Sequence, residues 1–284
     1  MQFPLVYTGN RVTIEKLSDR LYFRQGDLNA RRQCNGGYLV TDEGVVAVDA
    51  PSVEASEEMV QECQQLFGKP ICALVLTHPH PDHVWGLDAL LAKTGQIPVF
   101  AGKGAGEEIK NQGMQMPVNL IEIEGRENIP IGRAMMHLEK VPVQAHSPWD
   151  LMLFLQHEQA LFTGDLVVPA NEMYFKDCLL SGWEETLTAL QHRLDVTLLR
   201  GHGEAVEPPA QIKEQKAFLK AMHAVYAAMK KSGLVEQPYT EETVRPVFDE
   251  KIEQGDENAK TIWRVANKKV YYQLFKLFVT GREA

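Results

Sequence analysis

One short stretch, residues 77–83, constrains this chain more than any other part of its sequence. It reads Thr-His-Pro-His-Pro-Asp-His and directly follows the apolar run 72–76, which predicts a buried strand. Four potential metal ligands lie within it: His78, His80, Asp82 and His83. A strand that ends in a ligand-bearing turn delivers side chains to one edge of a sheet, so the stretch predicts a metal site at that edge.

Three further residues stand in similar places later in the chain. Each follows an apolar stretch and lies beside Gly or Pro, where a strand gives way to a turn. They are His146, Asp165 and His202. A single buried histidine is more often a core residue than a ligand, and a Gly-Asp pair is usually a turn, but those readings do not account for the whole set. His157, by contrast, lies in a predicted hairpin turn.

The residue types explain which metal such a site would bind. Zinc prefers imidazole nitrogen and carboxylate oxygen, and a catalytic zinc keeps one position open for water. Two metals can share a bridging hydroxide, and seven ligands suit such a pair. The two prolines of the stretch favour extended conformations for the residues before them, so His78 and His80 are expected to converge on one metal. Asp82 and His83 then lie round the bend, where they could serve a second.

The pattern Thr-His-x-His-x-Asp-His, followed at long spacing by His, Asp and His, resembles the metallo-β-lactamase-fold hydrolase superfamily. The glyoxalase II and lactonase branches are closest in ligand set, and the resemblance covers roughly residues 12–208. It implies an α/β fold, a four-layer αβ/βα sandwich, which the expected order of strands and helices also suggests. It further implies two zinc ions per chain, with iron or manganese as alternatives.

The resemblance also implies a role for each ligand. One metal is held by His78, His80 and His146, and the other by Asp82, His83 and His202. Asp165 bridges the two. Asp49 follows the expected strand 45–48 and matches an acidic residue that supports the site in family members; a helix N-terminal or turn residue is the alternative.

Two residues are candidates for catalysis in addition to the metals. Asp82, although first a ligand, could carry a proton to the leaving group; a metal-bound water is the alternative carrier. Tyr174 follows Asp165 by nine residues and could donate a hydrogen bond to the substrate carbonyl; the alternative is that it only packs.

The predicted function is that of a dinuclear zinc hydrolase that cleaves an acyl bond, a thioester or lactone, of a small molecule. The nucleophile is a hydroxide that bridges the metals. β-Lactam hydrolysis ranks lower, because the commonest metallo-β-lactamases have Cys or Ser where this chain has Asp165. An iron-dependent oxidoreductase on the same fold is a further alternative. The basic glutathione-binding motif of glyoxalase II has no clear match, although Lys268, Lys269 and Arg282 lie in the corresponding C-terminal part.

Composition narrows the class of protein, its partners and its cellular compartment. The 284 residues are 44% hydrophobic and 24% charged, which is typical of a globular protein. A net charge of −9 argues against nucleic-acid binding, which rests on cationic side chains. No apolar run approaches the ~20 residues needed to span a bilayer, and no signal peptide is visible. The four scattered cysteines favour a reduced cytoplasm, with a processed periplasmic chain as the alternative.

Apolar periodicity predicts two domains, a catalytic domain over residues 1–208 and a helical extension over 209–284. The extension carries two apolar stripes at helical spacing, 212–229 and 259–279, with a stop at Ser232-Gly233. These stripes are expected to pack together; a lid over the site or a homodimer surface is the alternative. Earlier strands are expected at 20–23, 37–40, 45–48, 71–76, 97–101, 120–123, 134–140, 151–155, 160–162 and 196–199. Earlier helices are expected at 85–93, 104–112 and 183–194, and from a cap at Ser52 or Ser56 to Phe67, with Gly68 as the stop.

Overall fold

The computed structural model describes residues 3–26, 33–169, 172–193, 195–205 and 208–231, with a few positions between 246 and 260. The chain forms two compact units. The first consists of Met1–Pro142, Trp149–Gly164 and Asp195–Glu207, and the second of Val143–Pro148, Asp165–Leu194 and Pro208–Ala284. The last segment of the second unit begins at Pro208, beside the predicted domain boundary at residue 208. The two-domain division itself stays a prediction, because the second unit also contains residues 165–194.

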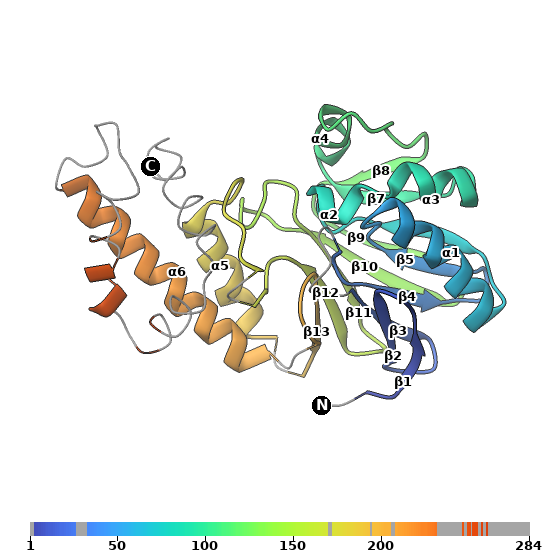
Figure 1. Ribbon diagram of the computed structural model, residues 1–284, viewed down its shortest axis with the longest axis horizontal. Helices are drawn as coiled ribbons and strands as arrows, with labels where there is room; N and C mark the ends of the chain where they lie inside the picture. Colours follow the sequence, from blue (N-terminus) through green and yellow to red (C-terminus); the bar gives the residue numbers. More distant parts are fainter. Residues whose placement is uncertain are drawn as a thin grey trace. The chain divides into compact units, whose positions relative to one another are not determined.

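An eight-stranded sheet in the first unit has its strands in sequence order (Figure 1). The strands are β1 (Leu5–Thr8), β2 (Val12–Lys16), β3 (Leu21–Gly26), β4 (Gly36–Val40), β5 (Val45–Val48), β6 (Ile71–Val75), β7 (Val99–Gly102) and β8 (Leu120–Ile123). The first five form an antiparallel meander. The short β-prone runs 20–23, 37–40 and 45–48 predict β3, β4 and β5, whereas β1 and β2 were not predicted. From β5 onward the pairing is parallel, because a helix connects each strand to the next.

The connecting helices are α1 (Val53–Phe67), α2 (Pro81–Val84), α3 (Leu87–Thr94) and α4 (Ala105–Asn111). Of the two predicted caps of helix α1, Ser52 is the one observed: its side chain accepts a hydrogen bond from the Ala55 N–H at 3.2 Å. Gly68 then ends the helix in a left-handed conformation, with φ of 62°. Met59 and Cys63 of α1 and Leu87 of α3 pack on the outer face of the sheet.

A second, five-stranded sheet of the first unit has the order β13-β12-β11-β10-β9. Its strands are β9 (Arg126–Ile131), β10 (Ala134–Lys140), β11 (Leu151–Leu155), β12 (Ala160–Gly164) and β13 (Thr197–Arg200). Only β12 and β13 are parallel. The two sheets share one apolar core, with Phe23 and Val75 of the first sheet beside Leu153 and Phe162 of the second. The predicted α/β class is confirmed.

The second unit contains the helices α5 (Leu180–Gln191) and α6 (Pro208–Lys231). Trp183 of α5 lies 5.7 Å from the ring of Phe175, which in turn lies 6.4 Å from Phe218 of α6. The helices expected over 183–194 and 212–229 are thus confirmed, whereas the stripe at 259–279 and the stop at Ser232-Gly233 lie outside the described residues. Among the described helices, none has the length and apolar character needed to cross a membrane.

Candidate metal centre

The ligand stretch occupies the point where β6 gives way to α2. His80 has φ of −66° and ψ of 151°, the extended conformation expected before a proline. Pro81 then opens α2, where its fixed φ and missing N–H are tolerated. Asp82 and His83 lie in this single helical turn, which the sequence suggested only as a bend.

A buried carboxylate holds this stretch from behind. Asp49 directly follows β5, and its backbone is left-handed, with φ of 60°. Its side chain accepts hydrogen bonds from the Thr77 N–H at 2.7 Å and the Thr77 hydroxyl at 2.8 Å. The same carboxylate lies 2.8 Å from Nδ1 of His83. Asp49 therefore orients a predicted ligand, and the helix-cap alternative is wrong because Ser52 caps α1.

These hydrogen bonds decide which histidine nitrogens face outward. A carboxylate only accepts hydrogen bonds, so Nδ1 of His83 carries the proton toward Asp49 and Nε2 keeps its lone pair. The Thr77 hydroxyl proton is directed at Asp49, so its oxygen can accept from Nδ1 of His78 at 3.1 Å. His78 would then also present Nε2. Fixing one ring nitrogen in this way is the usual support for a metal-binding histidine.

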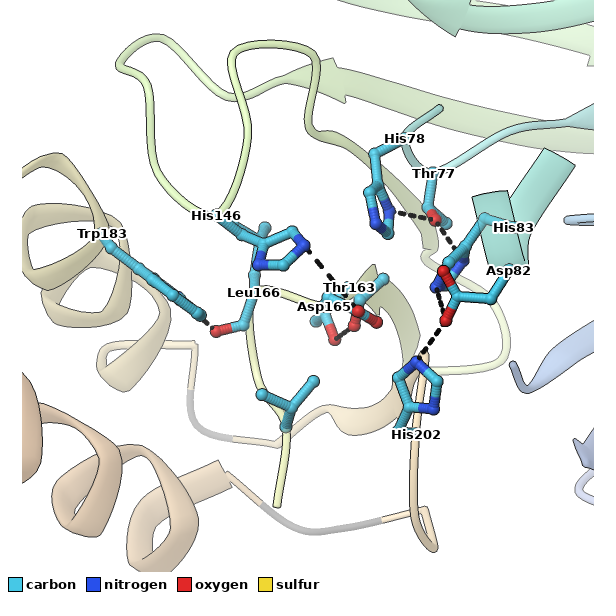
Figure 2. A network of polar contacts seen from close by, with 12 residues as sticks. Thr77, His78, Asp82, His83, His146, Thr163, Asp165, Leu166, Trp183 and His202 are labelled. Carbon is cyan, nitrogen blue, oxygen red and sulfur yellow. Dashed lines mark hydrogen bonds and ion pairs between the residues drawn. The ribbon is translucent and has the colours of Figure 1, made fainter. Parts of the chain in front are cut away.

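Asp82, His83 and His202 form a group whose candidate ligand atoms all lie within 4.8 Å of one another. Oδ2 of Asp82 is 3.1 Å from Nε2 of His202 and 3.9 Å from Nε2 of His83 (Figure 2). Zinc bonds of about 2.0–2.1 Å in tetrahedral geometry separate neighbouring ligand atoms by about 3.3 Å. Both the donor types and their spacing therefore fit a bound zinc.

His78 and His80 lie beside this group. The ring centroids of His78 and His83 are 4.1 Å apart, and those of His78 and His80 are 4.6 Å apart. His78, His80 and His83 are all buried, with at most 5% of their surface exposed. Burying several polar rings together is costly unless hydrogen bonds or a metal satisfy them, which favours a ligand role over simple packing.

Cys34 is a neighbour that the sequence did not reveal. It precedes β4, is fully buried, and forms a group with Asp49 and His83 in which the candidate ligand atoms lie within 4.8 Å of one another. Burial raises the pKa of the Cys34 thiol to about 12, although the nearby His83 lowers it in part. The thiol is therefore protonated at neutral pH. Nothing in the local sequence distinguishes this cysteine, because only the tertiary fold brings it to His83.

The second unit carries the other two predicted ligands. Nε2 of His146 lies 3.8 Å from Oδ2 of Asp165, a spacing similar to that of the first group. The His146 ring packs edge-on against Trp183, with centroids 5.2 Å apart. Trp183 also donates a hydrogen bond at 2.8 Å to the carbonyl of Leu166, the residue after Asp165 (Figure 2). Tyr174 is half-buried in the segment before α5.

The seven predicted ligands are thus divided five and two between the units, and each unit brings its own members together. Six of them are buried, and Asp82 is partly exposed. A buried, fixed set of imidazoles and carboxylates is the arrangement expected of a metal-dependent enzyme.

Comparison with known proteins agrees with this class. The sequence profile of the Metallo-beta-lactamase superfamily matches residues 30–202. This match spans well over half of the chain, and the chain therefore belongs to the metallo-beta-lactamase superfamily. It is a metal-dependent hydrolase with a His/Asp cluster suited to binding metal.

Individual relatives are more distant. The Probable metallo-hydrolase YqgX of Bacillus subtilis is 26% identical over 206 residues, which cover 66% of this chain and 92% of that protein. A Linear primary-alkylsulfatase of Pseudomonas sp. is 34% identical over 76 residues, but the chain spans only 14% of its length. The solved Metallo-beta-lactamase from Pontibacter korlensis has a TM-score of 0.66 at 19% identity, covering 74% of this chain and 99% of its own. This structural likeness shows the shared fold.

Proposed function

We propose that the chain is a dinuclear zinc hydrolase that cleaves the acyl bond of a small thioester or lactone. The observation that carries this proposal is the Asp82, His83 and His202 group, fixed from behind by Asp49. In the proposed centre His78, His80 and His146 would hold one ion, and Asp82, His83 and His202 would hold the other. Asp165 would be a ligand of both. Iron or manganese could take the place of zinc, because the same donor types bind them.

Two contacts inside the first unit support this proposal. The Thr77 carbonyl accepts a hydrogen bond at 2.8 Å from the N–H of Leu151, which follows His146 by five residues. At Gly164 a Cβ atom would lie only 2.8 Å from Cβ of Thr77. Gly164 is the residue before Asp165. Leu151, which follows the His146 segment, and Gly164, which precedes Asp165, therefore both lie beside Thr77, the residue before His78.

The residues around the centre have separate tasks in this proposal. Two bound ions would supply a polarised substrate carbonyl and a hydroxide nucleophile near neutral pH. Asp49 would hold His83, and Thr77 would hold His78, in the tautomer that leaves Nε2 for a metal. Asp82, the most exposed of the seven, can accept a proton and pass it to the leaving thiolate or alkoxide. Tyr174 would donate a hydrogen bond to the carbonyl oxygen as negative charge develops there.

The choice of substrate rests on the residue at the bridging position. Asp165 stands where the commonest metallo-β-lactamases have Cys or Ser, which favours a thioester or lactone over a β-lactam. A relative in Bacillus cereus named Metallo-beta-lactamase type 2 is 25% identical over 177 residues, so β-lactam hydrolysis is kept as the second candidate. The net charge of −9 makes a polyanion a poor partner. We also place the protein in a reducing cytoplasm, acting without nucleic acid or membrane.

The test is metal quantification on purified protein, followed by turnover of matched thioester, lactone, β-lactam and phosphodiester compounds at equal zinc loading. We expect about two zinc ions per chain and the fastest turnover on a thioester or lactone. One tightly bound iron without zinc would overturn the hydrolase assignment. Phosphodiester cleavage without acyl hydrolysis would overturn the substrate class, and efficient β-lactam turnover would make the second candidate the correct one.

A further inference from the structure

Asn35, which immediately precedes β4, joins three separate segments of the first unit through one carboxamide. Its Nδ2 donates hydrogen bonds to the carbonyls of Arg200 at 3.0 Å and Gly203 at 2.5 Å. Its Oδ1 accepts from the N–H of Gly26 at the end of β3, at 2.9 Å. The backbone N–H of Asn35 donates to the Gly201 carbonyl at 2.6 Å. Asn35 is only 2% exposed, which shields these bonds from solvent.

The three carbonyls that accept hydrogen bonds from Asn35 all belong to the turn that bears His202. The carbonyls of Arg200, Gly201 and Gly203 surround this residue in sequence, and the Gly201 N–H is held at 2.9 Å by the Gly164 carbonyl. Gly203 has φ of 79°, a conformation that glycine adopts without strain. A turn with two glycines has little conformational preference of its own, so Asn35 and Gly164 must supply it. The direction of the His202 side chain follows from that backbone.

The support that Asn35 gives to His202 parallels the support that Asp49 gives to His83. Asn35 lies at the start of β4, and Asp49 at the end of the neighbouring antiparallel strand β5, where Gly37 pairs with Val48. Asp49 fixes a ring nitrogen of His83, and Asn35 fixes the backbone around His202. Their two targets belong to the same group of candidate ligands, Asp82, His83 and His202.

We infer that Asn35 is a positioning residue for the metal held by Asp82, His83 and His202. The inference rests on the proposed function, in which His202 is a ligand. Without the carboxamide the 200–203 turn would sample several conformations, and His202 would bind only from a fraction of them. The apparent affinity for that one ion would fall by the same fraction, whereas the ion held by His78, His80 and His146 would be affected much less.

The experiment compares zinc binding by the wild type, Asn35→Ala, Thr41→Ala and His202→Ala in competition with a chromogenic chelator. Thr41 is the matched control because it follows the other end of β4 and is also buried. Its hydroxyl closes a turn through bonds to the Gly44 carbonyl at 2.9 Å and the Gly44 N–H at 3.2 Å. Both alanine variants remove buried turn bonds and should lower the melting temperature, but only Asn35→Ala should weaken one of two zinc ions, by about tenfold or more.

Equal affinities of both ions in Asn35→Ala and Thr41→Ala would overturn the inference. If Asn35→Ala does not fold, Asn35→Ser serves instead, because its hydroxyl can accept from Gly26 but is too short to reach the 200–203 carbonyls. Zinc binding by His202→Ala that matches the wild type would show that His202 is no ligand, and the proposed centre itself would then be wrong. If Asn35→Ser binds the second ion tightly while His202→Ala binds it weakly, only the proposed role of Asn35 is refuted.

Discussion

Replacing Asp49 with asparagine tests separately whether Asp49 orients His83 and whether it stabilises the fold. In the wild type the carboxylate accepts a proton from Nδ1 of His83 at 2.8 Å. An amide of the same shape can place its NH₂ group there, and a donor facing Nδ1 favours the tautomer with the proton on Nε2. That tautomer has no lone pair on Nε2 to give to a metal. We therefore expect Asp49→Asn to fold normally and to bind metal weakly.

The size of the effect follows from the contacts that are lost and kept. Disrupting a hydrogen-bond partner of a metal-binding histidine typically lowers affinity 10–100-fold, which is about 1.4–2.8 kcal/mol. Stability should change by only about 1 kcal/mol, since the amide oxygen still accepts from Thr77. Asparagine also tolerates the φ of 60° at this position. Alanine would lose all three hydrogen bonds and strain the backbone, at about 4 kcal/mol in total.

The assay pairs a chelator-competition titration with thermal unfolding of the metal-free protein. For Asp49→Asn we expect a melting temperature within a few degrees of the wild type and a weakened ion. Asp49→Ala should show both losses. Wild-type zinc affinity in Asp49→Asn would refute the reasoning, because the tautomer of His83 would then be irrelevant to metal binding. A large drop in melting temperature for Asp49→Asn would instead show that Asp49 is chiefly structural.

Four other outcomes can be checked on the same protein. Asp165→Ala should remove most activity and lower metal content while circular dichroism shows a folded protein; unchanged turnover would contradict its bridging role. Glu62→Ala should lower the free energy of unfolding by about 3–5 kcal/mol, because it strands the buried Arg24 guanidinium, 2.8 Å from the Glu62 carboxylate. Lys93→Ala changes a side chain that is 54% exposed and should lower the free energy of unfolding by less than about 1 kcal/mol. Of the four thiols only Cys72, the one that is not buried, should react quickly with a disulfide reagent in the native protein; rapid reaction of more than one would contradict the buried positions of the others.

Much of the fold could be predicted because its signals are local. Ser52 and Gly68 mark the two ends of α1, and both act through their own backbone and side chain rather than through distant contacts. The strands 120–123, 134–140 and 151–155 were predicted with the observed bounds, since short apolar or alternating runs between turn residues need little context. The ligand stretch was recognisable for the same reason, as its residues are adjacent in sequence.

Features that depend on distant partners were missed. Strand β9 begins with charged residues and contains Pro130, so only Ile129 and Ile131 alternate, and it forms because β10 pairs with it along the sheet edge. The single turn of α2 is too short to show helical periodicity. Cys34 and Asn35 look like ordinary residues before a strand, and their roles arise only where the segments around Asp49 and His202 meet them.

The topology explains why a metal site can be assembled from segments so far apart in the chain. Asp49 and the ligand stretch follow β5 and β6, which are parallel neighbours with Val48 opposite Val75. Asp165 and His202 follow β12 and β13, also parallel, with Gly164 opposite Arg200. Parallel strands end at the same edge of their sheet, which is where α/β folds place their binding residues. The ligand stretch, Asp165 and His202 thus each come soon after the end of one of these strands, whereas His146 lies six residues after the end of β10. A one-residue insertion inside β6 or β12 would turn the strand residues that follow it to the opposite face of the sheet.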